Sequence, residues 1–171
     1  MTVNKKDILI LGLGSDILMD DGIGTKLMWH LEKTLHDTRI KFETNLVGGM
    51  DIIELIRDYE KVIILDAIKT PDGIPGTIYL FNKDNFRETL HLSVVHDITF
   101  LTALKLAEKL CVKITDKIAI IAIEAEEYLT LGDQFSYKVQ AKYEQIKNEV
   151  ETMVKEFIQT KSKNIIYNQS I

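Results

Sequence analysis

Cysteine and proline are scarce in this chain: its 171 residues include one cysteine and two prolines. A single cysteine excludes an internal disulfide and any metal site built from several thiolates. Cys111 lies between two apolar segments, so we interpret it as a buried, inert thiol and not as a nucleophile. No stretch approaches the roughly 20 apolar residues that a membrane-spanning helix requires. We therefore expect a cytoplasmic protein that has no membrane partner.

The chain also lacks an excess of basic residues. Its 21 lysines and arginines are outnumbered by 26 aspartates and glutamates, which gives a formal net charge of −5. Nucleic-acid binding needs a concentrated basic surface, so this balance argues against a nucleic-acid partner. Two lysines precede an apolar run near the N-terminus, as in a signal peptide, but that run has no small-residue cleavage site and ends in glycines and aspartates. A buried strand is the better interpretation of this run.

Apolar runs alternate with helical patterns along the whole chain, which predicts an α/β fold. We expect a three-layer α/β/α sandwich around a mostly parallel, five-stranded sheet. Segment 77–81 follows the preceding strand too closely for a crossover helix, so a mixed sheet with this segment antiparallel fits the pattern as well. We predict a single α/β domain over residues 1–160 and a polar C-terminal tail at 161–171. The predicted strands are 7–13, 39–43, 61–68, 77–81 and 117–123, and the predicted helices are 22–36, 50–58, 97–110 and 135–158.

Polar side chains follow the predicted strands, where open α/β sheets bind their ligands. Asp21 follows the first strand, Asp66 ends the third, and His96 lies in the loop that enters the helix at 97–110. Two carboxylates and an imidazole from three segments could bind a divalent transition metal. Other polar residues and glycines follow the strands, namely Ser15, Asp16, Asp20, Asn45, Gly48, Gly49, Glu124, Glu126 and Glu127.

Each of these residues also has a simpler explanation. Asp20 or Asp21 could cap the helix that begins at residue 22, and His96 could be a surface or capping residue. Asp66 is harder to explain in this way, because a carboxylate at the end of an apolar strand is costly unless it is paired or faces a cleft. Their joint position favours the metal site.

Other classes of site are disfavoured by missing motifs. The GLG sequence at 12–14 resembles the start of a dinucleotide fingerprint, but Ile17 stands where the third glycine belongs and the segment then becomes acidic. An acidic loop repels a pyrophosphate, and no GK[ST] sequence is present. The GxSxG sequence of serine hydrolases is missing too. We therefore expect neither nucleotide binding nor a covalent nucleophile.

The motif LGLGSDILMDDGIG at Leu11–Gly24 resembles the opening motif of the hydrogenase maturation proteases, which process the large subunit of nickel-iron hydrogenases. Ser15 stands where that family usually has asparagine. Later segments resemble further landmarks of the family in the same order, over roughly residues 7–150. These segments are VGGMDII at Val47–Ile53, VIILDAI at Val62–Ile68, SVVHDITFLTAL at Ser93–Leu104 and IIAIEAEEYLTLGDQFS at Ile120–Ser136.

The resemblance implies that Asp21, Asp66 and His96 contact a metal and carry the catalysis. The metal would be nickel that arrives already bound to the large-subunit precursor, and a single cut would remove a short C-terminal extension from that partner. The segment after the second strand would contact substrate through Gly48, Gly49 and Asn45. The oligomeric state is not predicted.

One departure from the family's pattern affects the chemistry. The family often has an aspartate-glycine-glycine run after the second strand, whereas this chain has Thr44-Asn45-Leu46-Val47 before its two glycines. An acid proposed to aid the cleavage is thereby missing, and whether Asn45 or Asp51 replaces it stays open. A non-catalytic, metal-sensing chaperone or binding module for hydrogenase assembly is therefore the alternative function.

Overall fold

The computed structural model describes residues 7–46, 48–86, 89–90 and 100–160. Its centre is a five-stranded sheet with the strand order β2-β1-β3-β5-β4. The first four strands in that order run parallel, and β4 runs antiparallel to β5. The strands are β1 (Ile8–Leu13), β2 (Ile40–Asn45), β3 (Lys61–Ile68), β4 (Ile78–Phe81) and β5 (Ile118–Glu124).

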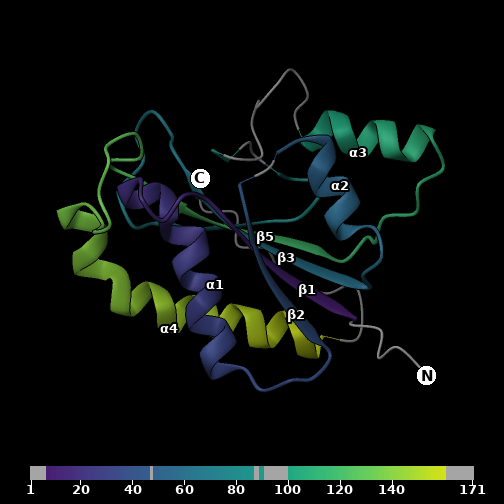
Figure 1. The fold of residues 1–171 in the computed structure, drawn as a ribbon, viewed down its shortest axis with the longest axis horizontal. Coiled ribbons are helices and arrows are strands. Elements are labelled where there is room, and N and C mark those ends of the chain that lie inside the picture. Colours follow the sequence, from purple (N-terminus) through teal and green to yellow (C-terminus); the bar gives the residue numbers. More distant parts are fainter. Residues whose placement is uncertain (1–6, 47, 87–88, 91–99, 161–171) are drawn as a thin grey trace.

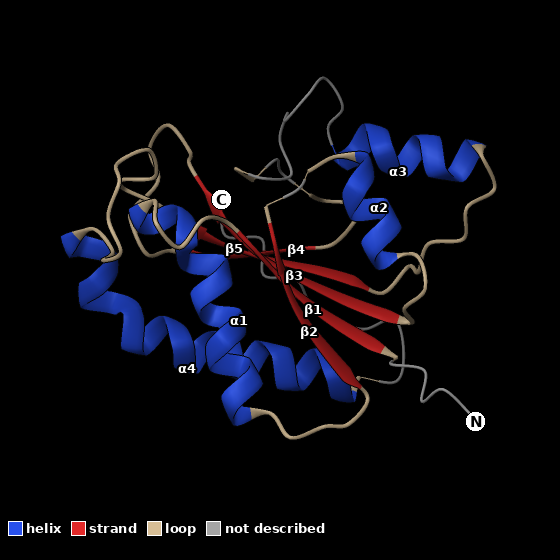
Figure 2. Cartoon of the chain, in the orientation of Figure 1, coloured by secondary structure: helices blue, strands red, loops and turns tan. Residues whose placement is uncertain are grey.

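Helices cover both faces of this sheet (Figures 1 and 2). On one face lie α1 (Ile23–Thr34) and α4 (Tyr137–Gln159); on the other lie α2 (Met50–Ile56) and α3 (Phe100–Lys109). A short 3-10 turn, η1 (Met19–Gly22), leads directly into α1. The three-layer α/β/α architecture and the mixed, mostly parallel sheet confirm the fold class predicted from the sequence.

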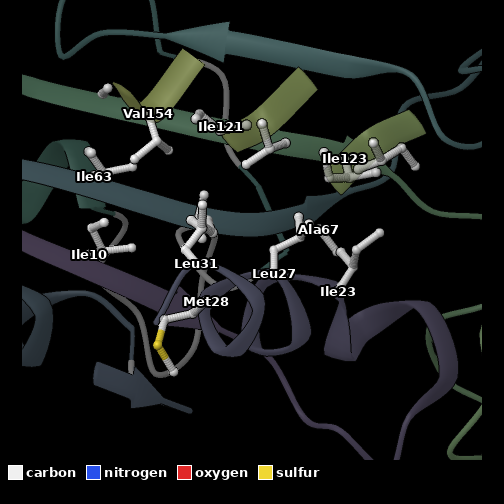
Figure 3. Packing of buried hydrophobic residues seen from close by; sticks show 14 of the residues in the cluster. Ile10, Ile23, Leu27, Met28, Leu31, Ile63, Ala67, Ile121, Ile123 and Val154 are labelled. Atoms are coloured by element: carbon white, nitrogen blue, oxygen red, sulfur yellow. The ribbon is translucent and has the colours of Figure 1, made fainter. Parts of the chain in front are cut away.

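The core is divided by the sheet into two apolar layers. Successive side chains of a strand point to opposite faces of the sheet. Every residue of β1, β3 and β5 except Lys61 is buried, so these strands contribute to both layers. Figure 3 shows the layer shared with α1 and α4, which contains Leu27 and Leu31 of α1, Ile63 of the sheet and Val154 of α4. Burial on both faces explains why these strands read as continuous apolar runs in the sequence.

One prediction about an individual residue can be compared with the structure. Cys111 was expected to be buried, and this is wrong: its side chain is exposed and its φ is +57°, just beyond the end of α3. No helix of the described residues is long and apolar enough to cross a membrane. The predicted tail at 161–171 lies outside the described residues, so the division of the chain stays a prediction.

Candidate functional site at the carboxyl edge of the sheet

The carboxyl ends of β1 and β3 meet the first turn of α1 at very close range. A Cβ atom on Gly24 would lie 2.3 Å from the carbonyl oxygen of Leu65 and 2.4 Å from that of Leu13. Glycine is therefore required where α1 begins, because any side chain would push the helix away from both strands. The turn η1, which carries Asp21, also contacts β3. Asp21 and Asp66 are thus brought to the same edge of the sheet.

The loop between β1 and η1 holds the carboxylate of Asp21 in a fixed position. Gly14 has a φ of +116°, and a Cβ atom there would lie 1.9 Å from the carbonyl oxygen of Asp21. The backbone N–H of Ser15 donates to Oδ2 of Asp21 at 2.8 Å, and the Thr25 hydroxyl donates to the carbonyl of Gly14 at 2.7 Å. The Asp21 residue is only 6% exposed.

Helix capping does not explain the paired aspartates. The N-cap of α1 is Gly22, and no side chain caps the helix there. The alternative that Asp20 or Asp21 caps this helix is therefore wrong. The two carboxylates instead have separate roles, since Asp21 binds within its own loop and Asp20 binds a distant part of the chain.

Asp66 is fully buried near the carboxyl end of β3, two residues before the strand ends. Its Oδ1 accepts a hydrogen bond from the Ala67 N–H at 2.8 Å, and its Oδ2 accepts one from the Thr89 hydroxyl at 2.5 Å. The next residue, Leu90, donates its N–H to the carbonyl of Ala67 at 2.9 Å. Residues 89–90 therefore lie along the end of β3, beside Asp66. His96 itself lies outside the described residues.

Asp20 links η1 to the loop between β5 and α4. It is fully buried, and its Oδ2 accepts the N–H groups of Glu126 at 2.8 Å and Glu127 at 3.0 Å. Ser136, at the N-cap of α4, donates its N–H to Oδ1 and its hydroxyl to Oδ2, both at 2.7 Å. These bonds satisfy the carboxylate completely, so Asp20 fixes the loop that borders the site. Its partners lie more than 100 residues away in sequence, and no local pattern could have identified them.

Glu124 is a further buried carboxylate, which the sequence analysis noted only as following the last strand. Its Oε1 accepts the N–H of Thr70 at 2.8 Å and its Oε2 accepts the Thr70 hydroxyl at 3.0 Å. A Cβ atom on Gly73 would lie 2.0 Å from the Glu124 carboxyl carbon. Glu124 therefore anchors the connection between β3 and β4 and leaves little room beside it.

Of the three residues after β2 that were predicted to contact substrate, only Asn45 lines the pocket beside the Asp21 loop. The carbonyl of Asn45 accepts the N–H of Gly14 at 3.4 Å, so Asn45 lies beside the loop that holds Asp21. This open pocket has a volume of about 370 Å³, and Gly14 and Ser15 line it together with Asn45. Gly48 and Gly49 precede α2 and do not line this pocket; Gly49 is the N-cap of α2 and has a φ of +54°. Glycine suits that left-handed conformation at Gly49.

The described residues supply two of the three predicted metal ligands. Among residues 7–46, 48–86, 89–90 and 100–160, no three histidine, cysteine, aspartate or glutamate side chains could share a metal ion. The third predicted ligand, His96, lies outside the described residues, so the three-residue metal site stays a prediction. Carboxylates directed by neighbouring N–H and O–H groups match the oxygen ligands that divalent metals take in proteins.

A larger cavity of about 600 Å³ is lined by none of the predicted site residues that the structure describes. Tyr59 and Glu60 line it just before β3 begins, and Lys117 lines it just before β5 begins. It therefore lies at the amino ends of the strands. Because ligands of open α/β sheets bind at the carboxyl ends, the smaller pocket is the one placed for chemistry.

Comparison with known proteins agrees with this architecture. The family model described as hydrogenase maturation protease matches residues 46–159, which is more than half of the chain. The chain therefore belongs to the hydrogenase maturation protease family. The matched region contains Asp66 and begins after the turn that carries Asp21.

Individual relatives show the same likeness. A Methanocaldococcus jannaschii protein, provisionally named a hydrogenase maturation protease, is 37% identical over 84 residues, which cover 48% of this chain and 54% of that protein. The alignment thus spans about half the length of that relative. The maturation protease HybD of Thermococcus kodakarensis is 27% identical, with 85% of this chain and 97% of that chain covered and a TM-score of 0.53. The endopeptidase HybD of E. coli, 22% identical with 87% and 92% covered, shares the fold at a TM-score of 0.65.

Proposed function

We propose that this protein is an endopeptidase that removes the C-terminal extension of a nickel-iron hydrogenase large-subunit precursor. Membership of the hydrogenase maturation protease family supports the class of substrate. The observation that carries the proposal is Asp66, a fully buried carboxylate at the carboxyl end of a central strand. It shares its edge of the sheet with the Asp21 turn, and both carboxylates are oriented by hydrogen-bond donors.

In this proposal nickel belongs to the substrate. Asp21, Asp66 and His96 would contact nickel already bound in the precursor, which would place the bond to be cut beside the loop at Gly14. Carboxylate and imidazole ligands suit such an ion, and bound nickel would polarise the peptide carbonyl or an attacking water. Asn45, Gly48 and Gly49 would lie along the substrate backbone after β2.

Processing of a nickel-loaded precursor tests these roles. We expect Asp21→Asn, Asp66→Asn and His96→Ala each to lower the rate of cleavage about 100-fold or more, measured by mass spectrometry of the precursor. Asparagine keeps the shape of both buried carboxylates, and circular dichroism would check that the fold survives. Glu32→Gln, on the exposed side of α1, is the matched control and should cleave normally. Normal cleavage by the triple variant would contradict the proposal.

A metal-sensing binding module is the second candidate function. The observation that favours it is the segment after β2, where Thr44-Asn45-Leu46 has no acid to assist a hydrolytic step. Such a module would bind the nickel-loaded precursor without shortening it. The same mass measurement, combined with a pull-down of the precursor, separates the two functions.

A further inference from the structure

The pocket beside the Asp21 loop is lined by two residues, Trp29 and Asp16, that have no part in the proposed metal contacts or in the hydrogen bonds that the described residues make at the site. Its volume is about 370 Å³, and Gly14 and Ser15 form the side next to Asp21. Trp29 of α1 lines it although 39% of this residue remains exposed. An indole on a pocket wall offers a large apolar face to a ligand at low cost in conformational entropy.

The charged group of this pocket is Asp16. Its residue is exposed, and within the described part of the chain its carboxylate makes no hydrogen bond or salt bridge. The other polar groups of the lining are uncharged, namely Ser15, Thr25, Thr44 and Asn45. An aromatic face together with an unpaired carboxylate is the combination that binds a cation, by cation–π attraction and by an ion pair.

Lys26 could neutralise Asp16, but its ammonium group binds elsewhere. Lys26 is near enough to Asp16 to interact with it through space, but its ammonium donates to the carbonyl of Asp133 at 2.5 Å. The same ammonium lies 4.3 Å from the centre of the Phe135 ring. Lys26 thus binds the loop between β5 and α4 and does not line the pocket, which leaves Asp16 available to a ligand.

We infer that this pocket binds an arginine or lysine side chain of the precursor segment that enters the site, with Trp29 and Asp16 as the residues that determine specificity. The inference rests on the proposed function, since the pocket shares Gly14 and Ser15 with the loop that fixes Asp21. Arginine is the better fit, because its planar guanidinium can stack on an indole while it pairs with a carboxylate.

Fluorescence tests the pocket without any cleavage or nickel, because Trp29 is the only tryptophan of the chain. The probe is a blocked pentapeptide with arginine at its centre and alanine elsewhere; the same peptide with citrulline, a neutral isostere of arginine, is its matched control. We expect the arginine peptide to change Trp29 emission and to bind about three- to tenfold more tightly than the citrulline peptide. Unchanged emission, or equal binding of the two peptides, would overturn the inference.

Two variants locate the charge that gives this preference. Asp16→Asn leaves the fluorophore Trp29 in place and removes the pocket carboxylate. The arginine and citrulline peptides should then bind with about equal affinity. Asp133→Asn removes a nearby exposed charge that does not line the pocket, so it should keep the preference. A preference lost equally in both variants would show only a diffuse acidic surface and would refute the site.

A precursor assay then connects the pocket with processing. Asp16→Asn should raise the KM for the nickel-loaded precursor about three- to tenfold and leave kcat unchanged, because the pocket binds substrate away from the reacting bond. The peptide titration does not depend on cleavage. Failure of the proposed peptidase activity and failure of the pocket are therefore seen in different experiments.

Discussion

Replacing Asp20 by alanine should destabilise the protein strongly, although the hydrogen bonds of its side chain go to neither Asp21 nor Asp66. The carboxylate accepts four hydrogen bonds, from the backbone of Glu126 and Glu127 and from both the N–H and the hydroxyl of Ser136. It is fully buried, so water cannot take its place without opening the loop between β5 and α4. The variant would leave these donors without their acceptor.

The magnitude follows from the kind of bonds that are lost. A hydrogen bond to a charged group contributes about 1.5–3 kcal/mol, and such contributions are not additive within one cluster. A buried donor left unsatisfied costs about 1–3 kcal/mol, so for the donors that Asp20→Ala leaves without an acceptor we expect a combined loss of about 3–5 kcal/mol. Asp20→Asn should cost about 1–3 kcal/mol. Its amide oxygen can take the place of Oδ2 and keep three donors, while its amide N–H would oppose the N–H of Ser136.

Urea denaturation followed by circular dichroism measures these differences in the free energy of unfolding. Glu32→Ala, on the exposed side of α1, is the control and should change stability by less than about 0.5 kcal/mol. A loss below about 1 kcal/mol for Asp20→Ala would show that the loop between β5 and α4 does not depend on this carboxylate. If Asp20→Asn proves as harmful as Asp20→Ala, the acceptor that asparagine retains contributes nothing, and this would contradict the explanation by hydrogen bonds.

Three further predictions concern the loops and the long closing helix. Gly14→Ala should cost about 3 kcal/mol or more in a thermal unfolding experiment, because its Cβ would meet the Asp21 carbonyl at a φ of +116°; unchanged stability would refute the close approach. Gly73→Ala should lower stability by displacing the buried Glu124 carboxylate, with Asp72→Ala on the same loop as the control. Burial raises the pKa of Tyr143 from 10.0 to about 12, so the folded state keeps a proton that the unfolded chain loses. The free energy of unfolding should therefore fall as the pH rises from about 10 to about 12, and Tyr143→Phe should lose less over that range; equal losses would contradict this explanation.

Much of the sheet could be predicted because its central strands are buried on both faces. The continuous apolar runs at 7–13, 61–68 and 117–123 correspond to β1, β3 and β5 with ends that differ by at most one residue. The connection from β3 to β4 is too short for a crossover helix. An antiparallel β4 was therefore compatible with the sequence, and the structure shows it. Cys111 was predicted wrongly, because the periodicity of α3 says nothing about a residue in a left-handed turn beyond its end.

The candidate site was less predictable than the sheet. The strand-end rule placed Asp21 and Asp66 at one edge, and the close packing of Gly24 on Leu13 and Leu65 explains why they meet there. The different role of Asp20 depends on partners in a loop that folds back from the far end of the sequence. Side-chain contacts over such separations leave no local pattern, so only the structure could assign it.

The dependence of cleavage on nickel tests the central proposal most directly. The purified protein would be incubated with one large-subunit precursor in two forms, loaded with nickel and free of nickel, and the masses of the products would be followed over time. The account predicts that only the loaded precursor is shortened, by the mass of its C-terminal extension. Cleavage of both forms at the same rate would contradict a site in which Asp21, Asp66 and His96 recognise metal on the substrate.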